Sequence, residues 1–372
     1  MRYFDNAATS YPKPEEVCRY ISAYLTECGG TYGRGSYERA LQATDITERC
    51  REALAAMMGT DDPARISFGP NATHGANTVL RGFDYVHKRV LISPLEHNAI
   101  TRPLEFLRGD IGLSVEVLDH LGDGSIDTER LRRRKLDNID MVIICHQSNV
   151  NGLTQDIGKI SEAIGGRTRL MTDLSQSLGH TPVDLDGWGV DFAAWTGHKG
   201  LLGPTGTGGC FIRDHEKVAP LVFGGTGSNS DSYLMPRHTP DKYEAGTPCI
   251  AAIAGLLGAL EHRPEPMHTR EEFVGLMERL TEIKGLKLIC ADDIERQGEL
   301  FSIVAEGMSV AELNDRLWRR HAIECRSGLH CAPLAHRSLG TSPAGTVRMS
   351  LSPYHTAEDL DFLAEAIEEV CS

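Results

Sequence analysis

The sequence lacks several features that would assign it to whole classes of protein. It contains no run of about 18 consecutive apolar residues, so we expect no transmembrane helix and no membrane partner. The opening residues MRYFDNAATSYPKP contain no apolar segment typical of a secretory signal, which predicts a cytoplasmic protein. Basic residues are outnumbered, with Lys+Arg 38 against Asp+Glu 52 and a net charge of −14. Because phosphate backbones attract basic surfaces, we expect no nucleic-acid partner.

The ten cysteines also lack a pattern that would explain them. No CxxC pair occurs, so we expect no structural zinc site and no other metal. Scattered cysteines in a long chain without a secretory signal argue against a disulfide framework. We therefore expect reduced thiols, most of which are small apolar side chains of the core.

Short apolar runs alternate with helical segments in the first half of the chain. Strands that alternate with helices predict a mainly parallel sheet covered on both faces, and hence an α/β protein. After about residue 250 the pattern changes to that of a smaller α+β domain, whose last helix begins with a capping box of Thr356 and Asp359. The predicted strands are 65–68, 89–93, 141–145, 169–173, 191–195, 209–212, 286–290, 300–306 and 322–328; the predicted helices include 14–28, 38–58, 98–107, 250–260, 309–320 and 356–370.

The segment from Thr172 to Gly209 contains the residue types of a pyridoxal 5′-phosphate (PLP) site. Asp173 ends one apolar strand and Lys199 follows another, where open α/β sheets present ligand-binding groups. A desolvated lysine forms Schiff bases readily and an aspartate can pair with a pyridine nitrogen, although Lys199 alone would also suit an ordinary surface turn. A Gly-Pro break precedes a helix that begins near Ala72, and its free N–H groups with Thr73 favour a phosphate.

Ten motifs occur in an order that resembles the PLP-dependent class V aminotransferase family, within it the cysteine desulfurase and selenocysteine lyase group. They are YFDNAATSYPKP (3–14), GRGSYERAL (33–41), PNATHGAN (70–77), EHNAITRP (96–103), HQSNVNG (146–152), D-x-x-Q-S (173–177), TGHK with GPTGTGG (196–209), YEAGTP (243–248), RSGLHCAPLAH (326–336) and VRMSLSPYHT (347–356).

The resemblance implies the type I fold of PLP-dependent transferases. A large PLP-binding domain, with a mainly parallel seven-stranded sheet, would span residues 15–255. Residues 1–14 and 256–372 would form the small α+β domain. The resemblance also implies a homodimer with shared active sites.

The resemblance further assigns cofactor-binding residues. Lys199 would carry PLP covalently and then move protons, and Asp173 would keep the ring nitrogen protonated. His97 would stack on the ring and act as an acid or base. The remaining groups would be Gln176 at the ring oxygen, Thr73, Thr196 and His198 at the phosphate, and Thr247 at the phosphate of the neighbouring subunit.

The substrate residues are implied in the same way. Arg348 would bind the substrate carboxylate in a bidentate pair with help from Asn149, and Arg34 would lie near the entrance. Cys331, on a loop predicted to be exposed and mobile, would attack the substrate sulfur, unless it is an inert buried cysteine. A charged His330 beside it would lower the pKa of the thiol.

These residues together imply a cysteine desulfurase of sulfur metabolism. It would convert L-cysteine to L-alanine and leave a persulfide on Cys331 for a sulfur-acceptor protein. Three alternatives stay open: a selenocysteine lyase that acts on L-selenocysteine, a class V aminotransferase or other PLP-dependent lyase, and a non-catalytic sulfur-trafficking scaffold. Residues 224–243 depart from the common family pattern, which leaves the acceptor open.

Overall fold

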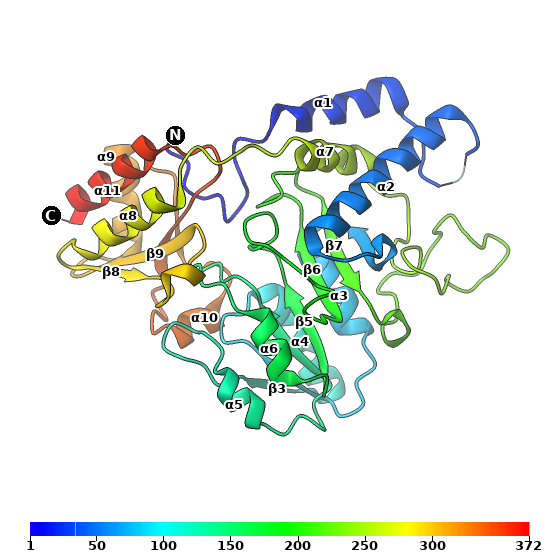
Figure 1. Cartoon of the computed structure of the whole chain (residues 1–372), viewed down its shortest axis with the longest axis horizontal. Helices are drawn as coiled ribbons and strands as arrows, with labels where there is room; N and C mark the ends of the chain where they lie inside the picture. Colours follow the sequence, from blue (N-terminus) through cyan, green and yellow to red (C-terminus); the bar gives the residue numbers. More distant parts are fainter. Residues whose placement is uncertain (34, 372) are drawn as a thin grey trace.

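The computed structural model describes residues 1–33 and 35–371 and contains two sheets (Figure 1). The larger sheet has seven strands in the order β1-β7-β6-β5-β4-β2-β3. Its β2, β3, β4, β5 and β6 run parallel, and β7 is antiparallel to both of its neighbours. The strands are β1 (Ile66–Gly69), β2 (Arg89–Ile92), β3 (Ser114–Val117), β4 (Met141–Cys145), β5 (Arg169–Asp173), β6 (Phe192–Thr196) and β7 (Gly208–Ile212).

Helices cover both faces of this sheet because its central strands are apolar on both sides. Val142 and Ile144 face one core, and Met141 and Ile143 face the other, as the alternation of side chains along a strand requires. The first core is completed by α2 (Glu38–Met58), α5 (Thr128–Arg133), α6 (Ile157–Ile164) and α7 (Ile250–Glu261), and the second by α3 (Ala72–Gly82) and α4 (Asn98–Ile111).

The smaller sheet is antiparallel, with the order β10-β11-β9-β8. A separate core joins it to three helices, and Phe4 from the N-terminal segment is buried in that core. Both chain ends lie at this domain in Figure 1. Its elements are α8 (Arg270–Thr281), β8 (Leu286–Ile289), β9 (Leu300–Ala305), α9 (Val310–His321), β10 (Arg326–Gly328), α10 (Pro333–Ser338), β11 (Thr346–Ser350) and α11 (Ala357–Cys371).

The structure confirms the predicted α/β class with a large mainly parallel sheet and a second, smaller domain. The predicted helix 14–28 is two pieces, α1 (Glu15–Ala23) and a π-helical turn (Tyr24–Cys28). The predicted strand 322–328 was too long, because Ala322 ends α9 in the left-handed conformation and only Arg326–Gly328 forms β10. The predicted capping box is present: the Asp359 N–H donates to Thr356 Oγ1 (3.3 Å) and the Thr356 N–H to Asp359 Oδ2 (3.0 Å).

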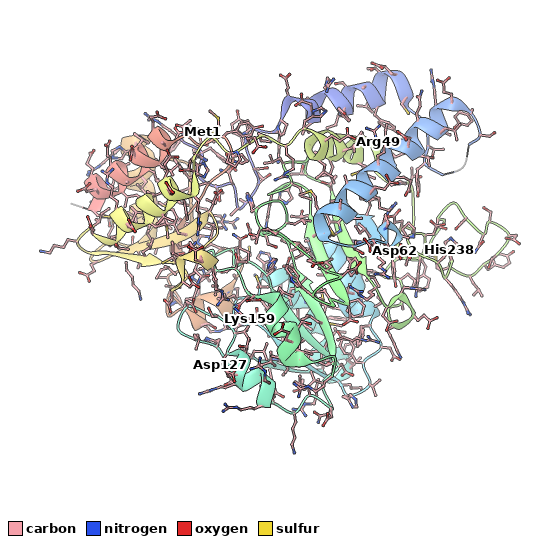
Figure 2. All side chains as sticks on the ribbon, viewed as in Figure 1. Met1, Arg49, Asp62, Asp127, Lys159 and His238 are labelled. Carbon is pink, nitrogen blue, oxygen red and sulfur yellow. The ribbon has the colours of Figure 1, made fainter. Side chains whose placement is uncertain are left out.

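Three further findings concern the described part of the chain. It contains no helix that is both long and apolar enough to cross a membrane. Its ten cysteines are all free thiols. A long segment between β7 and α7 projects away from the body of the molecule, and Figure 2 shows His238 on it, far from Met1 in the small domain.

Candidate active site

A cavity of about 250 Å³ lies at the carboxyl ends of the central strands. Asp173 ends β5, Thr196 ends β6, and the first residues of α3 and α4 face the same space. The small domain closes it with Arg326 and Arg348. The sequence-predicted residues that line this cavity are Thr73, His97, Asn149, Asp173, Gln176, Thr196, His198, Lys199 and Arg348.

Asp173 and Lys199 form the electrostatic centre of the cavity. Asp173 is buried, and its Oδ1 accepts hydrogen bonds from the Ser175 N–H (2.9 Å) and hydroxyl (2.5 Å). Burial lowers the pKa of the Lys199 amine to about 8, although the Asp173 charge opposes this effect. A substantial fraction of the amine is therefore neutral near physiological pH, as a nucleophile requires.

His97 is the N-cap of α4, and this role fixes its tautomer. Its Nδ1 accepts the Ala99 N–H at 3.0 Å, so the ring hydrogen of a neutral His97 lies on Nε2. Burial lowers the pKa of His97 to about 4; the Asp173 charge opposes this shift, and the cations Lys199, Arg326 and Arg348 contribute to it. His97 therefore presents a neutral ring to the cavity.

The first turn of α3 forms the opposite end of the cavity from the small domain. Asn71 caps this helix by accepting the His74 N–H (2.9 Å), and Thr73 is exposed toward the cavity. Strand β7 passes so close that a Cβ on Gly208 would lie 2.5 Å from the Asn71 Cα. The buried Nδ1 of His198 has no hydrogen-bond partner within the described chain. The free N–H groups at the start of α3, the Thr73 hydroxyl and the His198 ring nitrogen could together bind an anion.

Arg348 is buried at the small-domain wall and keeps one donor free. Its Nη2 donates to Asp5 Oδ1 (2.6 Å) and its Nη1 to the Asn149 carbonyl oxygen (3.2 Å). Within the described residues, Arg348 Nε and Asn149 Oδ1 have no partner although both are buried. Such unpaired groups are costly, and a bound carboxylate or amine would satisfy them.

Cys331 is exposed next to this wall, on a turn in which both His330 and Cys331 have positive φ (47° and 55°). One side chain and one backbone N–H of the large domain hold the turn. Asn149 Nδ2 donates to the His330 carbonyl oxygen (2.7 Å), and the Asn98 N–H donates to that of Cys331 (2.8 Å). The predicted exposure of Cys331 is thus confirmed.

The structure does not support the predicted charge on His330. That side chain is buried, is hydrogen-bonded to the Thr346 hydroxyl (3.0 Å), and burial lowers its pKa to about 2. The cation beside the thiol is Arg326, whose Nη2 lies 3.8 Å from Cys331 Sγ. Arg326 belongs to the motif at 326–336, but the motif did not indicate that Arg326 contacts Cys331. Only the register of β10 against β11, which pairs Arg326 with Arg348, brings it into the cavity.

Glu96 is a second residue that sequence reasoning missed. It is fully buried, and its Oε1 accepts the Ser93 hydroxyl hydrogen (2.7 Å). Burial raises the pKa of this carboxyl to about 8, and the Asp173 charge acts in the same direction. The buried Glu96 carboxyl is therefore mostly neutral near physiological pH.

One predicted site residue lies elsewhere, and another cannot be placed. Thr247 is exposed and lines a second cavity of about 210 Å³ with Pro70, His74 and Glu244. Arg34 lies outside the described residues. No group of three potential ligands for a metal ion occurs in the part of the chain that the structure describes.

Comparisons with known proteins agree over nearly the whole chain. The family described as aminotransferase class-V matches residues 2–363. A probable cysteine desulfurase of Methanothermobacter thermautotrophicus is 31% identical over 99% of this chain and 94% of its own, and probable cysteine desulfurase 2 of Mycobacterium leprae is 30% identical over 99% and 91%. Among solved structures, the apo cysteine desulfurase of Thermococcus onnurineus NA1 matches with a TM-score of 0.89 and 26% identity, over 99% of this chain and 94% of that one. The cysteine desulfurase CsdA of Escherichia coli matches with a TM-score of 0.85, 26% identity and the same coverage.

Proposed function

The chain belongs to the class V aminotransferase family, and from this membership and the site we propose that it is a cysteine desulfurase that uses PLP. The single observation that carries the proposal is that Lys199 and Asp173 share one cavity, and that the exposed Cys331 lies beside its wall, 3.8 Å from Nη2 of the cavity-lining Arg326. The lysine and aspartate suit the cofactor, and the cysteine suits sulfur transfer. An aminotransferase would not require the cysteine.

The residues present fit PLP. Asp173 is a charged carboxylate that can pair with a protonated pyridine nitrogen, and Gln176 and His97 line the space beside it. The helix N-terminus of α3, Thr73, Thr196 and the unpartnered Nδ1 of His198 form a cradle for a phosphate. When bound, PLP supplies an electron sink for the bonds at the substrate α-carbon.

The chain's own groups would bind and orient L-cysteine. Arg348 would pair with the substrate carboxylate through its free Nε. Asn149 would accept a hydrogen bond from the substrate amine through its free Oδ1. Lys199, which has an amine of lowered pKa, would remove and return protons at the α-carbon. The neutral His97 offers a further proton donor through Nε2–H.

Cys331 would accept the sulfur. Its thiolate would attack the substrate sulfur, so that an S–S bond forms while the C–S bond breaks, and the former β-carbon becomes the methyl group of L-alanine after protonation. The net conversion takes L-cysteine and the Cys331 thiol to L-alanine and a Cys331 persulfide. Arg326 Nη2 lies 3.8 Å from this sulfur and places a positive charge beside the attacking group. The exposure of Cys331 would let a sulfur-acceptor protein reach the persulfide.

We further propose a cytoplasmic homodimer, because two features suit a second copy and the free thiols suit a reducing compartment. Thr247 faces a cavity separate from that of Lys199, as a residue that serves a neighbouring subunit would. The projecting segment also exposes large apolar side chains that a partner would cover, namely Val222, Phe223, Tyr233 and Leu234.

One assay tests the function. Purified protein supplied with PLP is incubated with L-cysteine and a thiol reductant, and alanine and sulfide are measured in parallel. Equimolar alanine and sulfide are expected. Alanine without sulfide, or amino transfer that depends on a keto acid, would instead favour a different lyase or an aminotransferase. A protein that neither binds PLP nor turns over would be a scaffold.

A further inference from the structure

The N-terminal segment joins both halves of the active site. In the small domain, the Phe4 N–H donates to the Glu324 carbonyl oxygen (2.7 Å) and the Phe4 carbonyl oxygen accepts the Ser350 N–H (2.8 Å). Asp5 then pairs with Arg348. From there the segment crosses to the large domain and enters α1, as the dark blue trace in Figure 1 shows.

At the large domain, this segment converges on one carbonyl oxygen, that of His198. The Ser10 N–H donates to it at 3.0 Å, the Thr9 hydroxyl at 3.2 Å and Lys13 Nζ at 2.9 Å. The Ser10 hydroxyl also lies within hydrogen-bond distance, at 3.2 Å, and it accepts from Lys13 Nζ at 2.7 Å. This carbonyl belongs to the peptide group that links His198 to Lys199. Several donors, one of them an ammonium, thus hold the backbone from which the Lys199 side chain extends.

Lys13 is an unusual member of this group because it has no acidic partner. It is half-buried, and within the described residues it forms no salt bridge. Desolvation lowers the pKa of its amine to about 8. A half-buried amine without a carboxylate is costly for stability, so its hydrogen bonds to the His198 carbonyl oxygen and to the Ser10 hydroxyl suggest a role other than simple solvation.

We propose that Lys13 is a positioning residue for Lys199, which acts by holding the carbonyl oxygen of the His198–Lys199 peptide group. The inference rests on the proposed function, in which Lys199 carries PLP and transfers protons. A misplaced amine would transfer protons more slowly, because proton transfer depends on near-contact geometry. The substrate carboxylate is bound elsewhere, at Arg348, so its affinity should change little.

The Lys13 charge also gives the proposal a spectroscopic signature. The largest charge effects on the Lys199 amine come from Asp173, Arg348, Cys145 and Arg326. Lys13 acts on the neighbouring His198 and lowers its pKa. Because a nearby cation disfavours a second one, loss of the Lys13 charge should make protonation at Lys199 easier.

The test compares Lys13→Met, Lys13→Arg and the wild type as holoenzymes. For Lys13→Met we expect kcat to fall about tenfold while KM for L-cysteine stays within about twofold. We also expect the pH midpoint of the cofactor absorbance to move upward. Lys13→Arg, which keeps the charge and the hydrogen-bond donors, should have a kcat and a pH midpoint close to those of the wild type. The matched control is Lys159→Met, which removes an exposed lysine of α6 that pairs with Asp156 (2.9 Å) and is labelled in Figure 2.

The outcomes separate this inference from the proposed function. A wild-type protein that shows no cofactor absorbance and no turnover would overturn both. A normal wild type together with Lys13→Met of unchanged kcat and unchanged pH midpoint would overturn the role of Lys13 alone. Thermal unfolding is measured for each variant. If Lys13→Met does not fold, Lys13→Gln replaces it, and the same two readouts decide.

Discussion

Lys199 extends from the large domain into a cavity, whereas Cys331 lies at the surface on a turn of the small domain. The lysine backbone is held by several hydrogen bonds at the His198 carbonyl, and burial sets its pKa. The turn of Cys331 is held to the large domain by Asn149 and the Asn98 N–H, and its thiol lies beside a cation, Arg326. The comparison teaches that proton transfer and sulfur transfer have different requirements. A proton acceptor gains from desolvation and a fixed position, but a sulfur carrier must also be reached by a second protein.

The largest effect is expected on the lysine side. Lys199→Ala would remove the proposed covalent anchor of PLP and the proposed proton-transfer group, so alanine formation should fall by at least about 10³-fold. Borohydride reduction followed by mass measurement should then detect no cofactor attached at position 199. Lys159→Ala serves as the control and should behave as the wild type. If Lys199→Ala turned over L-cysteine nearly as fast as the wild type, Lys199 would not be the proton-transfer group. The comparison between Lys199 and Cys331 would then have no basis.

The next largest effect is expected on the cysteine side and should be specific to sulfur. Cys331→Ala should lower sulfide release from L-cysteine by about 10²-fold or more, because the nucleophile is gone, while cofactor binding is unchanged. Cys325→Ala is a matched control, since burial raises the pKa of that thiol to about 12 and makes it unreactive.

The same variant also decides between two of the candidate functions. If Cys331→Ala retains full turnover of L-cysteine, the persulfide mechanism is wrong. If it loses turnover of L-cysteine but processes L-selenocysteine at the wild-type rate, the site can release selenium without a nucleophile. Measuring alanine with each substrate distinguishes these results.

The reactivity of the Lys199 amine should depend on pH in a way that shows the effect of burial. With a pKa of about 8, the neutral fraction of Lys199 rises about 50-fold between pH 6 and pH 8. The pKa is lowered, so the reactive amine is present above pH 8 and is lost as the pH falls through that value. Acetylation of Lys199 in the cofactor-free protein, followed by mass spectrometry, should show this midpoint. Lys159, whose ion pair with Asp156 raises its pKa, is the internal reference. Equal midpoints for both lysines would show that the cavity does not lower the pKa of Lys199.

The smallest effect is expected from the cation at the cysteine. Arg326→Leu should slow alkylation of Cys331 by a negatively charged reagent by about three- to tenfold, since the positive charge beside the sulfur is removed. The effect is modest because solvent and salt screen an exposed pair. Arg326→Lys should keep most of the reactivity. An unchanged alkylation rate in Arg326→Leu would mean that Arg326 does not influence the reactivity of Cys331.

Much of the fold could be predicted from local patterns. Buried strands such as Met141–Cys145 and Arg169–Asp173 are continuous apolar runs, and the structure has them at the predicted bounds. Strand Ser114–Val117 was missed because it is a mostly exposed edge strand with a serine and a glutamate, and strand Thr346–Ser350 because polar residues alternate in it. Those two strands are stabilised by pairing with their neighbours, which no local pattern reveals.

The candidate site divides in a similar way. Residues within a motif, such as Asp173, Lys199 and Arg348, could be named from the sequence because a family resemblance carries them. The environment of each residue could not. The sequence suggested that His330, if charged, would act on the thiol, yet its side chain turns into the core and Arg326 lies beside the thiol. A left-handed turn over two residues decides which side chain faces the thiol, and neighbours in sequence do not reveal it.

The sequence by itself determined the fold class, the family and the identity of the reactive groups, because these depend on residue types and on short-range order. Only the tertiary structure decided how those groups are tuned. Burial lowers the pKa of Lys199, the register of β10 against β11 places Arg326 opposite Arg348, and Lys13 meets the His198 carbonyl from 185 residues away in the chain. Desolvation and charge–charge effects depend on distance in space, and the folding of the chain sets that distance.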